Sequence, residues 1–373
     1  MSAPQFFSHP QFTPPSFLKK AALTALQVGI TIGILWLVFR DPNKRHDMLA
    51  ALRNADSGWL YAGLIVYGLV EIIAGIRWQI LLKVQGIHLA WGRVFMLMMT
   101  GVFFNFFVPG GTGGDVVKTF YLLKETPGQR SQALLSVLVD RIIGLFSLIV
   151  LAGVLIALRW EWLTSNEQTT KYVWTGLAIL GASFFGIAGS FVITGCGLVH
   201  KLPARMPGRD KLAELAFAYN AYGRAWRAAL GSFGLSILAH LGYFGTFYCA
   251  AKAFAATGNR IPSFGEFYAM MPIINTILAM PISFGGLGAR EGLFQIFLGN
   301  LSGVAPAVAV VISMTGYMLT LFWGLIGGLL YIFYRPSEHA RLHEMNKEVA
   351  ALEHSVAEDE IAMELAKEKR PHR

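Results

Sequence analysis

The chain has 373 residues, of which 54% are apolar and 14% are charged, and its mean hydropathy is +0.51. Soluble domains carry about 25% charged residues, so this composition excludes an ordinary soluble protein and predicts a membrane protein with several spans. The net charge of +9 would suggest nucleic acid in a soluble protein. Here the basic residues lie in loops between apolar runs, where membrane topology and anionic headgroups account for them, so we expect no nucleic-acid partner.

The two ends of the chain differ from its apolar middle. Residues 1–18 are rich in proline and lack a helical period, so we expect a poorly ordered N-terminal arm. The transmembrane domain is predicted over residues 19–335, and residues 336–373 form a polar tail that we expect to be a solvated helix. The first apolar run, 21–39, has no small-residue cleavage site, which predicts a retained span instead of a signal peptide.

Long apolar runs predict six membrane-spanning helices. They cover about residues 21–39, 58–82, 131–159, 172–199, 228–251 and 306–334. Arg77 and Trp78, near the end of the second span, are typical of the membrane interface. Residues 209–227 predict an amphipathic helix that lies on the membrane surface. The excess of Lys and Arg in alternate loops places both termini in the cytoplasm.

Two glycine-rich turns interrupt the apolar sequence in a matching pattern. Each has an asparagine, then a proline, then a pair of glycines four and five residues after the proline, and a basic residue nine residues after it. The first set is Asn105, Pro109, Gly113, Gly114 and Lys118, and the second is Asn275, Pro281, Gly285, Gly286 and Arg290. Matching Gly/Pro interruptions in the two halves of an apolar chain indicate a central transporter site.

We interpret the turns as the tips of two re-entrant hairpins, because their apolar arms are short for full spans; two crossing helices in each are the alternative. Each half then has two spans, a hairpin and a span. Because three crossings is an odd number, the second repeat, 172–334, is inverted relative to the first, 19–159. The predicted fold is an all-α polytopic membrane protein of about six transmembrane helices and two Gly/Pro-broken re-entrant hairpins in an inverted repeat.

Ionisable residues inside the spans, and the turns themselves, are the candidates for a site. Irregular backbone at membrane depth must be buried or face a wet cavity, and a helix that begins after such a turn directs free amides at an anion. The predicted substrate-binding residues are Asn105, Pro109, Gly113, Gly114, Asp115, Lys118, Asp140, Arg141, Asn275, Gly285, Gly286, Gly288, Arg290 and Glu291. Glu71 and Asp140 are candidates for proton uptake and release. The alternative is that these charges only pair with one another.

Motifs of soluble enzymes fail on inspection. The segment 111–119 is similar to a phosphate-binding loop, but Val117 stands where that loop requires glycine. Neither a zinc-binding helix nor a nucleophile elbow is found. We therefore predict no catalytic residue, no cofactor and no metal site.

These residues together resemble the transmembrane family of the lysylphosphatidylglycerol synthetases and flippases of bacterial envelopes. The matching pieces are Arg77-Trp78, Asn105 with Pro109 and Gly113-Gly114-Asp115, Asp140-Arg141 followed by Gly144-Leu145, and Gly285-Gly286-Leu287-Gly288 with Arg290-Glu291. The resemblance covers roughly residues 20–335. It implies a protein of the bacterial inner membrane that moves an anionic phospholipid or lipid-linked headgroup between leaflets. Full-length synthetases also have a cytosolic aminoacyl-transferring domain, which none of the polar segments here is long enough to form. Lys118 stands where arginine is expected.

Three functions remain open. They are a lipid flippase, an intramembrane lipid-modifying enzyme, and a membrane scaffold for a separate lipid synthase. The inverted repeat favours the flippase, because a two-fold site at the midplane suits alternating access. Membrane lipids are the expected partners, and a second copy of the chain or a lipid synthase is a further candidate. We expect the two turns to meet near the middle of the bilayer, with Lys118, Arg141 and Arg290 contacting the headgroup.

Overall fold

The computed structural model describes residues 53–107, 113–126, 129–195, 221–255, 261–280 and 286–333. Within these ranges the chain forms helices and no strand, which confirms the all-α membrane fold. Five helices are long and apolar enough to cross a membrane: α3 (Ser57–Val84), α6 (Arg130–Leu158), α8 (Glu167–Gly195), α11 (Trp226–Ala253) and α14 (Pro306–Phe333). The N-terminal arm, the first predicted span and the C-terminal tail lie outside the described residues.

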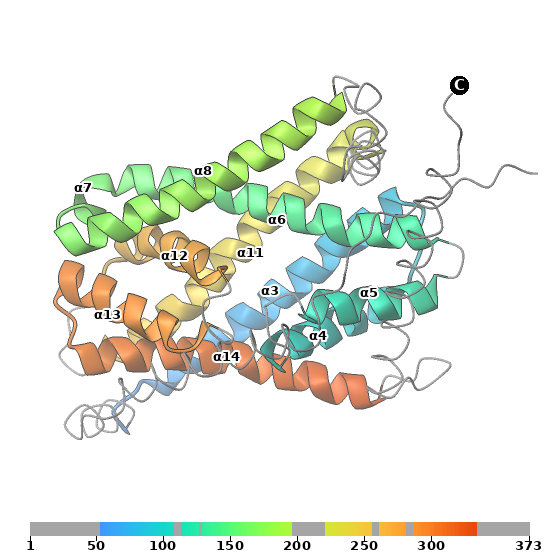
Figure 1. Cartoon of the computed structure of the whole chain (residues 1–373). Coiled ribbons are helices and arrows are strands. Elements are labelled where there is room, and N and C mark those ends of the chain that lie inside the picture. The colour runs from blue at the N-terminus through green and yellow to red at the C-terminus, as the bar shows by residue number, and fades with distance from the viewer. Residues whose placement is uncertain are drawn as a thin grey trace, which may run out of the picture.

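Two pairs of shorter helices complete the bundle. They are α4 (Trp91–Phe107) with α5 (Gly113–Glu125), and α12 (Phe264–Leu278) with α13 (Ala289–Ser302). At 1.5 Å per residue they are about 20 to 26 Å long, whereas the five long helices reach about 42 to 44 Å. The two pairs lie at opposite ends of the bundle (Figure 1). Residues 108–112 and 281–285, which join each pair, lie outside the described residues, so re-entrant hairpins and the meeting of the two turns stay predictions.

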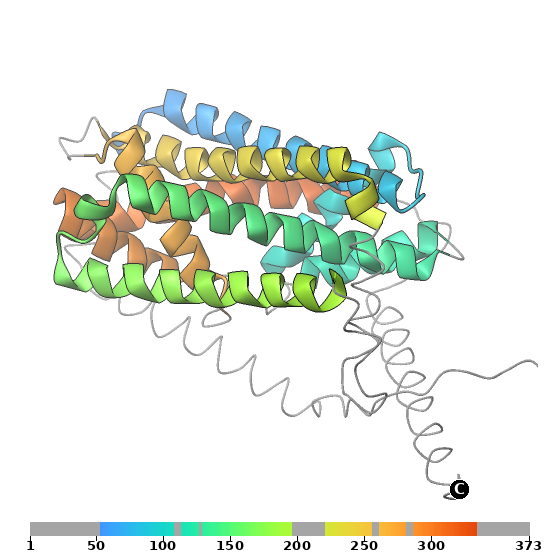
Figure 2. The same ribbon diagram turned by 90° about the horizontal axis from the view of Figure 1, so that it is seen from above.

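The helix contacts repeat between the two halves of the chain. Each half contributes a long helix, a short pair and a long helix in the same order: α3, α4, α5 and α6, then α11, α12, α13 and α14. The equivalent long helices α3 and α11 pack side by side (Figure 2). In addition, α4 packs against α14 of the other half, and α12 packs against α6 in the equivalent manner. This exchange of partners is the pattern that an internal repeat produces.

Small residues allow the two halves to approach closely. A Cβ atom on Gly327 of α14 would overlap the backbone carbonyl of Met99 on α4, and one on Gly324 would overlap the ring of Phe106. Helices in a bilayer associate through such close packing, because lipid tails are as apolar as the side chains themselves. The glycines of α14 therefore fix its contact with the first short pair.

Capping residues set the helix ends that the sequence pattern missed. Asn166 accepts hydrogen bonds from the backbone amides of Gln168 and Thr169, so α8 begins at Glu167, five residues before the predicted start. Ser263 and Glu266 form a capping box that starts α12. A short helix that the sequence did not predict, α7 (Trp160–Leu163), joins α6 to α8.

The predicted interfacial helix, 209–227, lies mostly outside the described residues. Near its end, the buried Tyr222 donates a hydrogen bond to the carbonyl of Leu81 on α3, with a distance of 3.0 Å between the two oxygens. Burial raises the pKa of Tyr222 to about 12, so the phenol stays protonated and donates at physiological pH. This contact attaches the segment before α11 to the end of α3.

Candidate functional site

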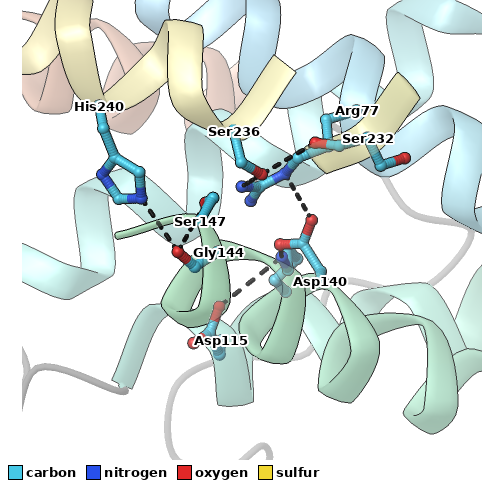
Figure 3. A network of polar contacts seen from close by, with 9 residues as sticks. Arg77, Asp115, Asp140, Gly144, Ser147, Ser232, Ser236 and His240 are labelled. Atoms are coloured by element: carbon cyan, nitrogen blue, oxygen red, sulfur yellow. Dashed lines mark hydrogen bonds and ion pairs between the residues drawn. The ribbon is translucent and has the colours of Figure 1, made fainter. Parts of the chain in front are cut away.

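Five charged side chains from three helices form one ion-pair network in the first half of the chain. The Nε atom of Arg77 on α3 lies 2.9 Å from Oδ1 of Asp140 on α6. Nζ of Lys118 on α5 lies 3.8 Å from Oδ2 of Asp140 and 3.6 Å from Oδ1 of Asp115. Arg141 on α6 pairs with the other oxygen of Asp115. We call these five residues the charge cluster; Figure 3 shows Arg77, Asp140 and Asp115 of it from close by.

The charge cluster carries a surplus positive charge and is open on one side. It has three cations and two carboxylates, which leaves a formal charge of +1. The side chains of Lys118 and Asp140 are each 7% exposed, whereas that of Arg141 is 54% exposed. Removing charges from water is costly unless they are paired, so the buried members are held in fixed ion pairs. The guanidinium of Arg141 is therefore the part of the cluster that lies on its open side.

Three members of the charge cluster, Arg77, Asp140 and Arg141, lie well inside long helices. Arg141 is the twelfth residue of α6, about 17 Å from its start, and Arg77 is seven residues, about 10 Å, before the end of α3. Ionisable groups at such positions are rare in membrane helices and are functional candidates by default.

Polar and aromatic groups surround the cluster. Arg77 Nη1 donates a hydrogen bond of 2.8 Å to the hydroxyl of Ser236 on α11, and Nε2 of His240 lies 3.0 Å from the carbonyl of Gly144 (Figure 3). Nζ of Lys118 lies 4.4 Å from the centre of the Trp78 ring, a favourable cation–π contact. Sequence reasoning missed Ser236, because a serine within an apolar run gives no signal of its own.

The interfacial interpretation of Arg77 and Trp78 is wrong. Trp78 is 1% exposed and packs in the core, and Arg77 forms the ion pair with Asp140 instead of contacting headgroups at the membrane surface. The reason is that α4 and α6 pack against α3, Lys118 of α5 lies over the Trp78 ring, and α3 continues for six residues beyond Trp78. Of the pairings that the sequence left open, the one between Asp140 and Arg77 is present.

The first glycine turn positions Asp115 and Lys118. The side-chain oxygen of Asn105 on α4 accepts a 3.0 Å hydrogen bond from the amide of Gly114, in the first turn of α5. A Cβ atom on Gly114 would overlap the carbonyl oxygen of Gly101, so α4 and α5 touch backbone to backbone here. Asp115 follows in the same first turn, where a carboxylate interacts favourably with the helix dipole. Gly113 is also buried there, and Pro109 lies outside the described residues.

The second turn is held by a different set of contacts. Gly286 and Gly288 have φ values of 74° and 80°, a region that side chains with a Cβ rarely adopt. The buried carboxylate of Glu291 accepts hydrogen bonds from the Gly288 amide at 2.5 Å and from the hydroxyl of Ser313 on α14 at 3.1 Å. Its role here is to cap α13 and attach it to α14.

The structure places Arg290 against α14. Its guanidinium carbon lies 4.5 Å from the centre of the Tyr317 ring, and the guanidinium also packs close to Gly286. Asn275, on α12, is partly buried and its backbone carbonyl accepts from the Ala279 amide. Gly285 lies outside the described residues. The structure thus gathers Asp115, Lys118, Asp140 and Arg141 in one place and gives Arg290 and Glu291 separate contacts with α14.

Comparison with known proteins identifies relatives over most of the chain. A family model described as the lysylphosphatidylglycerol synthase TM region matches residues 24–328. A UPF0104 membrane protein of Methanothermobacter thermautotrophicus is 24% identical over 320 residues, which are 76% of this chain and 87% of that protein. A second such protein of the same organism is 21% identical over 324 residues, 82% of this chain and 93% of its own length. The UPF0104 membrane protein PH1989 of Pyrococcus horikoshii is 25% identical over 135 residues, 36% of this chain and 39% of that protein.

Proposed function

This multi-pass membrane protein belongs to the family of the lysylphosphatidylglycerol synthase TM region, and from this premise we propose that it is a lipid flippase. Its cargo is an anionic phospholipid or lipid-linked headgroup, which it moves between the two leaflets. The observation that carries the proposal is the charge cluster, a partly buried group with a surplus positive charge inside the spans. In this proposal the protein lies in the bacterial inner membrane with both termini in the cytoplasm, as the bias of its basic loops favours.

The surplus positive charge of the cluster has the sign needed to lower the free-energy barrier that an anionic headgroup meets in the bilayer. A charge at the centre of a bilayer costs at least about 2.5 to 3.5 kcal/mol on insertion scales. A phosphodiester with one negative charge would offset the surplus of the cluster and remove most of that cost. Arginine suits this role, because its planar guanidinium binds phosphate oxygens in pairs.

The proposed roles follow from burial. Arg141, on the exposed side, receives the headgroup first, and Lys118 binds it as it crosses. Arg77 holds Asp140, and the first glycine turn holds Asp115 and Lys118 in position. The acyl chains stay in the bilayer beside α5 and α6, so only the polar headgroup enters the protein. The repeated helix order of the two halves suits a motion that opens the site to each face in turn.

The proposal is tested with purified protein in vesicles that contain fluorescent NBD-phosphatidylglycerol. Dithionite quenches the probe in the outer leaflet, so movement between leaflets appears as loss of fluorescence beyond the initial outer fraction. We expect Arg141→Gln to slow this movement roughly a hundredfold, the rate equivalent of one uncompensated charge at depth. The matched control is Lys171→Gln, which removes an exposed cation at the start of α8 that pairs with the exposed Glu167. We expect the control to keep the wild-type rate.

The outcomes separate the three functions. Arg141→Lys keeps the charge and is expected to keep most of the activity, which separates loss of charge from misfolding. If Arg141→Gln and Lys118→Met both insert, fold and move lipid at the wild-type rate, the cluster only holds the bundle together and the proposal is wrong. Chemical conversion of the lipid without movement, seen by mass spectrometry, would favour the enzyme. Neither movement nor conversion would favour the scaffold.

A further inference from the structure

Glu71 is a buried carboxylate that does not belong to the charge cluster. It is 5% exposed and is the fifteenth of the 28 residues of α3, half way along the helix. It shares a side-chain hydrogen bond with Tyr67, one turn earlier on the same helix. The ring of Tyr67 in turn contacts that of Tyr243 on α11, with 6.2 Å between the ring centres. Glu71 therefore lies among tyrosines in the middle of the bundle.

Glu71 differs from the other carboxylates inside the bundle. Asp115 and Asp140 each pair with two cations, and Glu291 accepts two hydrogen bonds. In the part of the chain that the structure describes, no cation lies within ion-pair distance of Glu71. A buried carboxylate without a cation at ion-pair distance is costly when ionised, and proton uptake removes that cost. Asp140, the other candidate for proton exchange, lacks this property because Arg77 and Lys118 stabilise its charge.

The groups that act directly on Glu71 lie on α3 itself: they are Tyr67 and Arg77. One step further out, Tyr67 interacts with Tyr243 on α11 and Arg290 on α13, and Arg77 interacts with Asp140 on α6 and His240 on α11. Arg77 is six residues after Glu71, about 9 Å along the helix axis, and interacts with it electrostatically. The charge state of Glu71 thus acts on the charge cluster through Arg77.

A count of the charges inside the bundle shows what a proton at Glu71 changes. Away from the outer helix ends, the described spans and short pairs hold four cations and four carboxylates: Arg77, Lys118, Arg141 and Arg290 with Glu71, Asp115, Asp140 and Glu291. With Glu71 ionised, its negative charge balances the surplus of the charge cluster, and the interior as a whole is neutral before an anion binds. With Glu71 protonated, the interior carries +1, which one anionic headgroup neutralises.

We propose that Glu71 is a proton-binding site that couples lipid movement to a proton gradient, with one proton and one anionic headgroup crossing together. This inference rests on the proposed function and adds its source of energy. The proton binds to a carboxylate oxygen of Glu71 from one side and leaves the same oxygen toward the other, so no other bond forms or breaks. Because the proton and the headgroup carry opposite charges, the combined movement transfers no net charge.

The coupling has a quantitative signature. At equilibrium, each unit of pH difference across the membrane is expected to change the ratio of the anionic lipid between leaflets tenfold, in favour of the alkaline side. A membrane potential is expected to have no effect. A flippase that moves the anion without a proton would respond to the membrane potential and would ignore the pH difference.

The experiment uses vesicles of phosphatidylcholine in which NBD-phosphatidylglycerol is the sole anionic lipid. The leaflet ratio is measured after a pH difference of one unit, or a potassium diffusion potential, has been imposed. The wild-type protein is expected to give about a tenfold shift with the pH difference and none with the potential. Glu71→Gln, which imitates the protonated state, is expected to exchange the probe without following the pH difference. The matched control Glu167→Gln, an exposed carboxylate on α8, is expected to behave as the wild type.

A second measurement tests proton binding without transport. Infrared difference spectra of the purified protein are expected to show a protonated carboxyl band that Glu71→Gln removes and Glu167→Gln keeps. The inference is overturned if this band is missing, if wild-type movement ignores the pH difference, or if His240→Gln abolishes the pH response while Glu71→Gln keeps it. A wild-type protein that moves no lipid under any gradient refutes the proposed function and the coupling together, while the band still decides whether Glu71 binds a proton.

Discussion

Replacing Asp140 by asparagine tests the charge cluster as a structural unit. The substitution keeps the shape of the side chain but removes the carboxylate that lies 2.9 Å from Arg77 and 3.8 Å from Lys118. Both cations then lose their shared partner in a buried site. Removing one partner of a buried ion pair typically lowers the free energy of unfolding by about 3 to 5 kcal/mol, because the remaining charge stays desolvated. We expect Asp140→Asn to lower the free energy of unfolding by about that amount.

Unfolding by SDS in mixed micelles, followed by tryptophan fluorescence, measures this loss. Glu167→Gln breaks an exposed ion pair and is expected to cost no more than about 1 kcal/mol. The double variant Arg77→Met with Asp140→Leu removes both charges and is expected to recover part of the loss, since no uncompensated arginine remains. A loss of less than about 1 kcal/mol for Asp140→Asn would refute the conclusion that this pair holds α3 and α6 together.

Three substitutions at the glycine turns give further predictions by the same unfolding assay. Gly114→Ala is expected to lower the free energy of unfolding by about 1 to 3 kcal/mol, because its Cβ overlaps the carbonyl of Gly101. The control is Gly231→Ala, in open space on α11, which is expected to be neutral or stabilising. Gly286→Ala is expected to cost about 1 to 2 kcal/mol because of its positive φ, and an unchanged stability would mean that the turn adopts another conformation. Glu291→Gln is expected to lower stability by about 0.5 to 2 kcal/mol through the weakened cap of α13, and a variant as stable as the wild type would contradict that role.

The five spans that the structure describes were predictable from sequence to within a few residues, because the bilayer fixes the length of the apolar run. The predicted spans 58–82 and 306–334 correspond to α3 and α14 with shifts of two residues or fewer. The larger error, at the start of α8, arose because Asn166 caps a polar first turn that a hydropathy pattern does not record. The short α7 was missed for a different reason: its four residues are too few to show a helical period.

The members of the site were partly predictable, but their pairings were not. Charge inside an apolar run identifies Asp140 and Lys118 without any structure, because such residues are rare there. That Arg77 pairs with Asp140 and donates to Ser236 depends on the packing of helices far apart in sequence. Glu71 and Asp140 are equivalent candidates for proton exchange in the sequence, and only the positions of the cations around them separate the two.

The central claim is that an anionic headgroup binds at the charge cluster, and an experimental structure of the full chain in nanodiscs containing phosphatidylglycerol tests it most directly. We expect phosphate density within hydrogen-bond distance, about 2.7 to 3.2 Å, of the guanidinium of Arg141 or the ammonium of Lys118. The same density should be absent in nanodiscs that contain phosphatidylcholine as the sole lipid. Lipid density confined to the outer surface of the bundle in both preparations, with Arg141 still paired only with Asp115, would contradict the claim.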